Sequence, residues 1–151
     1  MTARVLVDSN VLLYCYDRSD PAKQHQALDV VDQLTTTGAG ALSTQVLGEF
    51  FVNALRKVAM PLEEASVRID HYLRVWRILD VTSRVVEEAV RGVRAYRLNY
   101  WDAQIWAAAR VYGLSAIFSE DFAIGAALEG VRFVNPLNPS FHVADWLSAF
   151  R

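Results

Sequence analysis

Short apolar runs alternate along the chain with longer segments in which apolar residues recur at helical spacing. The short runs have the character of buried strands and cover residues 5–7, 41–42, 78–81, 115–118 and 131–134. Helical segments separate most neighbouring runs, which is typical of parallel strands joined by crossover helices. This order predicts an α/β fold, a three-layer α/β/α sandwich around a mostly parallel sheet.

The helical segments carry start and stop signals. The first begins at Asp20 and Pro21, a capping residue followed by a proline in the first turn, and ends at Gly38. Further helices are predicted over residues 43–57, 61–76, 83–96 and 103–109. Their apolar faces are wide enough to pack against a sheet.

The first strand predicts where the chemistry lies. Residues 5–7 are apolar at three neighbouring positions, as suits a strand covered on both faces, and Asp8 follows them directly. In open α/β sheets the functional crevice lies beyond the carboxyl ends of the strands. We therefore expect Asp8 at that edge of the sheet.

A second acid, Glu49, lies in a segment that is otherwise free of charge. It is the only charged residue between Asp32 and Arg56, and most of its neighbours are aliphatic or aromatic. A carboxylate in such surroundings needs a cation, a metal or a proton. The alternative is a structural acid that lies on an exposed strip of the helix or pairs with an arginine.

Two more acids stand at the ends of predicted elements. Asp102 begins an alanine-rich helix that is poor in charge, and Asp121 closely follows the strand at 115–118. An aspartate in a first helical turn can also complement the helix dipole without any chemistry. Close packing of the alanine-rich helix onto the sheet would instead bring Asp102 to the strand ends.

Four isolated acids are thus expected at one edge of the sheet: Asp8, Glu49, Asp102 and Asp121. Carboxylates so placed cannot all ionise unless cations neutralise them, and oxygen ligands suit Mg²⁺ or Mn²⁺. Such a site can act on a phosphate. Ser9, Asn10 and Ser119 carry hydroxyl or amide groups. These groups could orient a metal-bound water or support the carboxylates.

Composition and charge limit the size of the protein and its partners. The 151 residues are 53% hydrophobic and 21% charged, which predicts one domain with a substantial core. The formal net charge of -2 provides no basic field for nucleic acid. A polyanionic partner would therefore have to be attracted by local groups or by metal ions.

Cys15 is the sole cysteine and lies in an apolar run, so an internal disulfide is excluded and a small buried side chain is expected. No segment approaches the roughly 18 apolar residues of a membrane span, and the start of the chain lacks a long apolar signal region. These features predict a soluble, cytoplasmic protein without a membrane partner.

Four stretches of the chain resemble PIN-domain nucleases, most closely the VapC-like toxins of bacterial toxin–antitoxin pairs. The stretches are VLVDSNVLLY, STQVLGEFFVNA, YWDAQIWAAARVYGLSAIFSED and VRFVNP, within residues 3–136. The resemblance implies that Asn10 is the small polar partner of an acidic quartet formed by Asp8, Glu49, Asp102 and Asp121. It also implies an endoribonuclease that cleaves RNA with Mg²⁺ or Mn²⁺, forms a homodimer and is inhibited by a cognate antitoxin.

The resemblance leaves some positions to be accounted for. Residues 1–136 would form the nuclease domain, whereas 137–151 extend past the usual end, and Ser119 stands where many members have threonine. Arg18 and Arg97 are candidates for steering the RNA backbone toward an acidic pocket that would otherwise repel it. The arginines around Arg97 also fit a solvated helix surface with local charge pairs.

Two other interpretations stay open. An aspartate after the first strand also marks domains that accept a phosphoryl group, but Asn10 stands where these have a second aspartate, and the chain has only Lys23 and Lys57 to act as their assisting lysine. A non-catalytic module would keep the fold and use the carboxylates to bind metal or RNA without turnover.

The tail carries a separate expectation. Residues at helical spacing behind a possible Ser140 cap predict a short amphipathic helix, and they are Val143, Trp146, Leu147 and Phe150. A helix this short is marginal in water, so it should dock on this subunit or on a dimer partner.

A homodimer is also expected from the aromatic and aliphatic content of a small chain. The residues that motivate it are Phe50, Phe51, Tyr72 and Trp76. Large apolar side chains with too little core to hide them usually mean a partner.

Overall fold

The structure, a computed structural model, describes residues 3–122 and 124–149. A sheet in the order β3-β2-β1-β4-β6-β5 forms its centre. The strands are β1 (Val5–Val7), β2 (Gly40–Ser43), β3 (Arg77–Leu79), β4 (Ala116–Phe118), β5 (Ala127–Leu128) and β6 (Val131–Val134). Within this sheet β5 runs antiparallel to β6, and the other neighbours are parallel.

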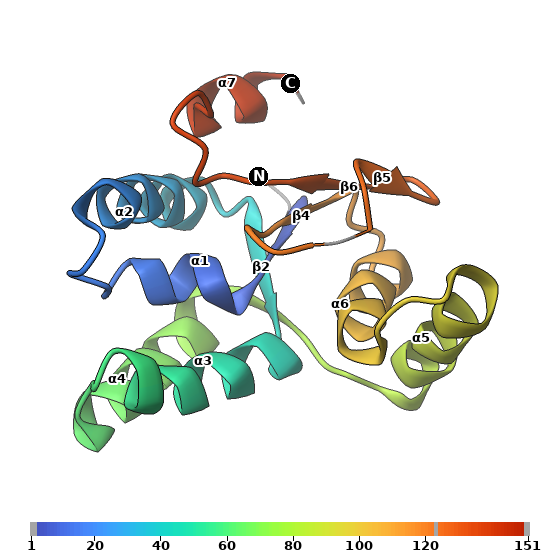
Figure 1. The fold of residues 1–151 in the computed structure, drawn as a ribbon, viewed down its shortest axis with the longest axis horizontal. Helices are drawn as coiled ribbons and strands as arrows, with labels where there is room; N and C mark the ends of the chain where they lie inside the picture. The colour runs from blue at the N-terminus through green and yellow to red at the C-terminus, as the bar shows by residue number, and fades with distance from the viewer. Residues whose placement is uncertain (1–2, 123, 150–151) are drawn as a thin grey trace.

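Helices cover both faces of the sheet. Those in the described residues are α1 (Ser9–Tyr14), α2 (Pro21–Thr37), α3 (Thr44–Lys57), α4 (Leu62–Val75), α5 (Ser83–Tyr96), α6 (Tyr100–Val111) and α7 (Val143–Ser148). Because parallel crossovers are right-handed, the connections from β1 to β3 place α1–α4 on one face, and the return to β4 places α5 and α6 on the other. Figure 1 shows these two groups on opposite sides of the strands, which confirms the predicted α/β/α sandwich.

The strand order positions the candidate site. From β1 the chain moves outward to β2 and β3, and it then returns to the other side of β1 to form β4. A crevice is expected beyond the carboxyl ends of the two strands between which the order reverses. Those ends are Val7 and Phe118, which pair with each other and are followed by Asp8 and Ser119.

Side-chain caps begin three helices, α2, α3 and α5, close to the starts that the sequence predicts. Asp20 accepts a hydrogen bond from the backbone N–H of Lys23, Ser43 accepts one from Val46, and Thr82 accepts one from the third residue after it. Each cap satisfies a backbone N–H that the first helical turn leaves free.

Several elements differ from the expectation. The third strand ends at Leu79 rather than at Val81, whose N–H donates to Thr44 instead of to the sheet. The antiparallel β5 was not predicted, because a two-residue strand carries no periodic signal. Residues 9–14 form α1, which begins immediately after the strand because the Asp8 carboxylate caps it.

The tail helix is shorter than predicted and has a different start. It follows His142 rather than Ser140, because the N–H and hydroxyl of Ser140 both donate to Asn138 Oδ1. Phe150 lies outside the described residues. Val143 and Leu147 are buried in the main core, so the tail helix packs on its own subunit.

An edge-to-face aromatic contact and hydrogen bonds also hold the tail on this subunit. The ring of Trp146 lies 4.8 Å from that of Phe118 at the end of β4, at an angle of 69°. The side-chain amide of Gln26 also donates to the carbonyls of Pro136 and Phe141, at 3.1 and 2.8 Å. The tail therefore packs against β4, the strand that precedes Ser119.

We expect Leu147→Ala to lower the free energy of unfolding by about 2–3 kcal/mol, because the change leaves a cavity where a buried side chain met the core. Urea unfolding followed by circular dichroism measures the change. Ser148→Ala in the same helix is the control, since Ser148 is exposed and alanine favours a helix. Equal stabilities of the two variants would show that the tail contributes nothing to the core.

The core contains three of the four aromatic residues from which a partner was inferred, and the fourth, Phe51, is only half-buried. Phe50, Tyr72 and Trp76 are at most 7% exposed, and the rings of Phe50 and Tyr72 meet edge to face at 5.5 Å. The fold of one chain thus covers these three, and they give no reason for a dimer. Any such reason has to come from side chains that remain exposed.

Cys15 is buried, as predicted, and burial raises the pKa of its thiol to about 12. At neutral pH the thiol stays protonated and behaves as a small apolar group. In the part of the chain that the structure describes, none of the helices combines the length and the apolar character that a membrane span requires.

Candidate active site

Asp8 forms the centre of the candidate site, at the junction of β1 and α1. Its carboxylate Oδ1 accepts from the Ser9 N–H at 2.8 Å, and its Oδ2 accepts from the Ser119 hydroxyl at 2.7 Å. The residue is only 9% exposed. Two hydrogen bonds therefore hold a nearly buried carboxylate in one orientation.

Asn10 joins this carboxylate to the segment after β4. Its side-chain amide donates to the Ser119 hydroxyl at 3.0 Å and lies 3.4 Å from Asp8 Oδ2 and 3.5 Å from Asp121 Oδ2. The side-chain oxygen of Asn10 accepts a hydrogen bond from the Glu120 N–H at 3.3 Å. One turn of α1 thus determines where Asp121 lies.

Glu49 reaches the same place from α3. Its carboxylate accepts from the Ser9 hydroxyl at 3.2 Å and from the Gln45 side chain at 2.8 Å. No arginine, lysine or histidine forms an ion pair with it among the described residues. The arginine pairing named as an alternative is therefore absent from this part of the chain, and the half-buried acid is held by neutral groups.

Asp102 lies in the first turn of α6, which Asn99 caps through its side-chain oxygen. Partial burial raises the pKa of Asp102, and the carboxylates of Glu49 and Asp121 raise it further. The helix-dipole role proposed as an alternative does not account for this mutual repulsion. The alanine-rich helix does pack against β4 and β6, as its composition suggested.

The electrostatics connect the members of the cluster. Burial raises the pKa of Asp8 from 3.8 to about 6, and repulsion from Glu49 and Asp102 adds to that effect. The hydrogen bonds from Ser119 and Ser9 act in the opposite direction, because they stabilise the ionised carboxylate. The four predicted acids therefore lie within electrostatic reach of one another, directly or through one neighbour.

The donor set fits a hard divalent cation. Mg²⁺ and Mn²⁺ prefer oxygen ligands, and the raised pKa values of Asp8 and Asp102 show carboxylates that a cation would stabilise. Within residues 3–122 and 124–149, no three His, Cys, Asp or Glu side chains are close enough together to enclose an ion. The carboxylates would have to draw together around the metal.

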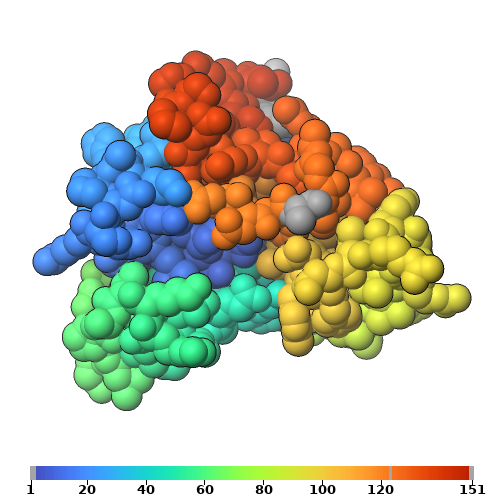
Figure 2. Space-filling model, in the orientation of Figure 1, coloured from blue at the N-terminus to red at the C-terminus, as the bar shows by residue number. Residues whose placement is uncertain are grey.

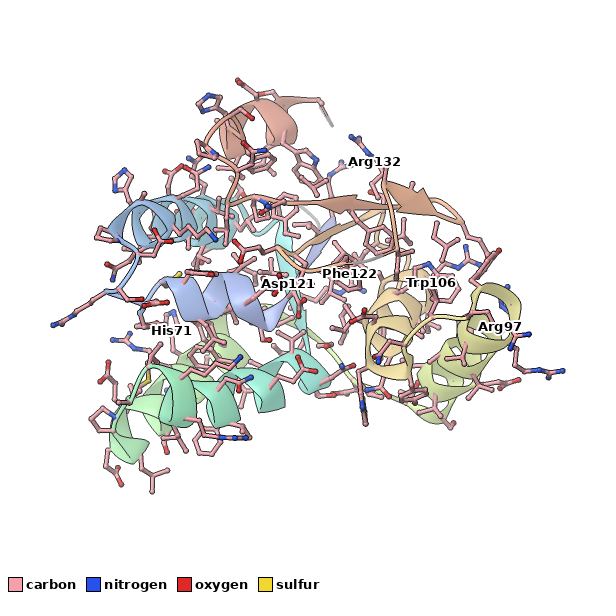
Figure 3. The ribbon with its side chains drawn as sticks, in the orientation of Figure 1. His71, Arg97, Trp106, Asp121, Phe122 and Arg132 are labelled. Atoms are coloured by element: carbon pink, nitrogen blue, oxygen red, sulfur yellow. The ribbon has the colours of Figure 1, made fainter. Side chains whose placement is uncertain are left out.

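Figure 3 shows where the last acid lies. Asp121 lies on the near side of the sheet between α1 and α6, and its backbone N–H donates to the Ser119 hydroxyl at 3.2 Å. It is the exposed member of the set, whereas Asp8 is the buried one. A substrate or ion arriving from solvent would therefore meet Asp121 first.

Neither of the two arginines proposed to steer RNA forms an ion pair with the four acids among the described residues. Arg18 follows α1 and lines a cavity of about 530 Å³ at the C-terminal end of that helix. Arg97 caps the C-terminal end of α5 and shares a pocket of about 390 Å³ with Asp102, and Figure 3 places it at the outer edge of α5. Neighbouring Arg91 pairs with Glu88 and Glu129, as expected of a solvated helix surface.

A chain of neutral side chains behind Glu49 was not anticipated from the sequence. Gln45 accepts from the Gln104 amide at 2.8 Å, and Gln104 accepts from the Tyr100 hydroxyl at 2.8 Å. The signals for it were present: Gln45 precedes Glu49 by one helical turn, and Gln104 interrupts a buried run of apolar residues. This chain links α3 to α6 across the site.

A second unanticipated group holds the segment that carries Asp121. Lys23 pairs with Glu120 at 2.7 Å, and the Tyr14 hydroxyl donates to the same carboxylate at 3.0 Å. The Lys23 ammonium also lies 5.0 Å from the centre of the Tyr14 ring. These contacts direct Glu120 away from the cluster and leave Asp121 facing it.

Comparison with known proteins shows a family match. The family model described as PIN domain matches residues 5–127, which is most of the chain. A search of curated proteins finds no match.

Several solved structures share the fold. A toxin–antitoxin complex from Klebsiella pneumoniae is 22% identical, with a TM-score of 0.63 over 87% of this chain and 97% of that one. VapC20 of Mycobacterium tuberculosis, described as a toxin that cleaves the sarcin–ricin loop, is 21% identical, with a TM-score of 0.63 over 85% and 98% of the two chains. A DNA-bound VapBC from Salmonella typhimurium is 14% identical, with a TM-score of 0.62 over 89% and 98%.

Proposed function

The chain belongs to the PIN domain family, and we propose that it is a metal-dependent endoribonuclease and the toxin of a toxin–antitoxin pair. The observation that carries the proposal is the buried Asp8 carboxylate. It lies at the crevice of the sheet, its pKa is raised, and Glu49 and Asp102 repel it. Such an arrangement costs stability unless it has a ligand, and a divalent cation is the ligand that its oxygen donors suit.

Asp8, Glu49, Asp102 and Asp121 are the residues that would hold Mg²⁺ or Mn²⁺. When bound, such an ion lowers the pKa of a coordinated water and stabilises charge on the leaving oxygen of a phosphodiester. Ser119 and the Ser9 N–H orient Asp8, and the Ser9 hydroxyl and Gln45 orient Glu49. Asn10 keeps the Asp121 segment beside them.

Support for RNA as the substrate and for an antitoxin as the partner comes from proteins of the same fold. One neighbour is described as a toxin that cleaves the sarcin–ricin loop, another as a toxin–antitoxin complex, and a third as a DNA-bound VapBC. A phosphoryl-accepting domain has no such support. The near-neutral charge of this chain also fits an enzyme that relies on bound cations to attract RNA.

We expect purified protein to cleave mixed RNA in the presence of Mn²⁺ and to lose this activity when EDTA removes the metal. Asp121→Asn should abolish cleavage, because it removes an acid that faces the cluster. Asp32→Asn, a change of the same kind on the exposed surface of α2, should leave it intact. Electrophoresis of the RNA measures the products. Metal-dependent RNA binding without cleavage would instead identify a non-catalytic module.

We also propose that the protein is a homodimer, now on the basis of α4 rather than the aromatic core. Leu62 and Leu73 are 57% and 50% exposed and lie on one stripe of α4 with Ile69. Ile69 lines a groove of about 400 Å³ together with Leu47 and Phe51 of α3. Such an exposed apolar surface is typical of an interface.

The expected result is that Leu73→Lys converts a dimer into a monomer, because a buried unpaired charge at an interface is costly. Light scattering coupled to size exclusion measures the mass. Val86→Lys is the control, since Val86 is 40% exposed on α5, away from the groove. A wild type that is already monomeric at micromolar concentration would contradict the proposal.

A further inference from the structure

Two cavities lie side by side along α1, and one of them reaches the candidate active site. The small cavity, of about 160 Å³, is lined by Asn10 and Asp121 at one end. The large cavity, of about 530 Å³, is lined by Arg18, Gln24 and Met60 among others. Residues common to both linings are Asp17, Lys57 and Val58. The two spaces are therefore contiguous, and Lys57 stands at their junction.

The surface view shows the same recess. In Figure 2, α1 (dark blue) lies deeper than the green α3–α4 pair on one side and the orange segment that follows β4 on the other. The recess thus runs from the acidic cluster along α1. A linear substrate held in it would pass the candidate metal site.

The size and lining of the large cavity suit an organic group rather than an ion. Its volume falls within the range of about 300–1,000 Å³ that is typical of ligand pockets, and the small cavity falls below it. Apolar atoms of Cys15, Val58, Met60 and Pro61 contribute to its wall. A flat aromatic ring could therefore lie against one side of it.

Charge argues against a second phosphate in the large cavity. Arg18 and Lys57 contribute two positive charges to its lining, and Asp17 and Glu64 contribute two negative ones. The Asp17 carboxylate accepts from the N–H and hydroxyl of Ser19, which keeps it ionised by lowering its pKa. A cavity with balanced charges and hydrogen-bonding groups fits a neutral nucleobase better than an anion.

Lys57 differs from the other lysine near the site. Lys23 is paired with Glu120, whereas Lys57 takes part in none of the ion pairs found among the described residues. Lys57 is exposed, in the last turn of α3, and reaches both cavities. Its ammonium group is therefore available for an anion that lies between them.

We propose that the two cavities form one substrate track: the large cavity holds the base of an unpaired ribonucleotide next to the cleaved bond, and Lys57 binds the phosphate that leads to it. The proposal rests on the ribonuclease function proposed above and extends it to base recognition. Proteins read RNA sequence mainly by placing unstacked bases in such pockets, whereas phosphate contacts set position.

The phosphate contact is tested with a short randomised RNA in Ca²⁺, whose binding is followed by fluorescence anisotropy at several salt concentrations. Lys57→Met should weaken binding several-fold and reduce the slope of log affinity against log salt by about 0.7, the value for one phosphate contact on a single strand. Arg56→Met is the matched control, because Arg56 is an exposed neighbour on α3 that lines neither cavity. Equal slopes for both variants would overturn the contact.

The base pocket is tested by filling the large cavity. Ser19→Trp should change the base preference at one position beside the cleaved bond, measured by sequencing the products of the randomised RNA made with Mn²⁺. Ser140→Trp is the matched control, because Ser140 is exposed and donates to Asn138 through its N–H and hydroxyl just as Ser19 does to Asp17. An unchanged preference in Ser19→Trp would overturn the pocket.

The outcomes also separate this proposal from the ribonuclease function. If the wild type cleaves RNA and Lys57→Met and Ser19→Trp both behave like their controls, the substrate track is contradicted and the nuclease function is supported. The opposite result is a wild type that binds RNA without cutting it, with weaker binding in both variants but not in their controls. That result would support the substrate track and contradict the nuclease function. No binding and no cleavage would overturn both.

Discussion

Asp8→Asn is expected to abolish RNA cleavage and, at the same time, to stabilise the metal-free protein at neutral pH. The pKa of Asp8 is raised from 3.8 to about 6, so the folded state disfavours its ionised form. Each pKa unit corresponds to about 1.4 kcal/mol, which gives a cost of up to about 3 kcal/mol for the ionised carboxylate. The amide of asparagine has nearly the same shape and carries no charge.

The pH dependence of this effect has a definite sign. A raised pKa means that the folded protein holds the proton more tightly than the unfolded chain does. The cost of ionising Asp8 is therefore absent below about pH 4, grows between about pH 4 and 6, and is complete above about pH 6. The free energy of unfolding of the wild type should fall across that window relative to that of Asp8→Asn.

Adding Mn²⁺ should reduce the difference between the two stabilities. A ligand at 100 times its dissociation constant stabilises the folded state by about 2.7 kcal/mol, and the variant that lacks a central carboxylate should gain less. Urea unfolding with and without Mn²⁺ measures both effects, and Asp32→Asn serves as the control. Retained cleavage together with lower metal-free stability in Asp8→Asn would identify Asp8 as an ordinary structural acid.

Ser119→Ala is expected to weaken Mn²⁺ binding and RNA cleavage by about 10- to 100-fold, the usual effect of removing a group that orients a metal ligand. The Ser119 hydroxyl donates to Asp8 at 2.7 Å and accepts from the Asn10 amide and the Asp121 N–H. Its loss leaves the buried carboxylate less stabilised, which raises the pKa of Asp8 further. The Asp121 segment also loses an anchor.

Ser119→Thr is the matched variant, because it keeps the hydroxyl at the same position. It should retain most of the metal affinity and activity, which isothermal titration with Mn²⁺ and the cleavage assay measure. If threonine and alanine were equally damaging, the volume of the side chain rather than its hydroxyl would matter. If both were harmless, the Asp8 carboxylate would not depend on Ser119 for its orientation.

Much of the fold could be predicted because its signals are local. The caps Asp20 and Ser43 act within one helical turn, and the three apolar residues 5–7 show by themselves that the strand is covered on both faces. The order of strands and helices then restricts the topology, since parallel crossovers are short and right-handed. Elements without a periodic pattern, β5 above all, could not be predicted in this way.

The candidate acids could be named from the sequence because each is isolated in a segment poor in charge. Glu49 and Asp102 stand out for that reason alone. Their roles remain a prediction, and the sequence does not show which acid is most perturbed. That depends on burial: Asp8 is almost enclosed by β1, α1 and β4, whereas Asp121 is open to solvent.

The sequence by itself therefore determined most of the elements, the fold class and which acids are candidates, because those depend on residues within a few positions of one another. Only the tertiary structure decided how the acids are held. The Ser119–Asp8 bond spans 111 positions and the Lys23–Glu120 pair joins α2 to the segment after β4. Such contacts depend on which strands and helices become neighbours. The sequence could name Ser119 as a candidate, but no local pattern shows which carboxylate a hydroxyl or an ammonium group so far away in the chain will reach.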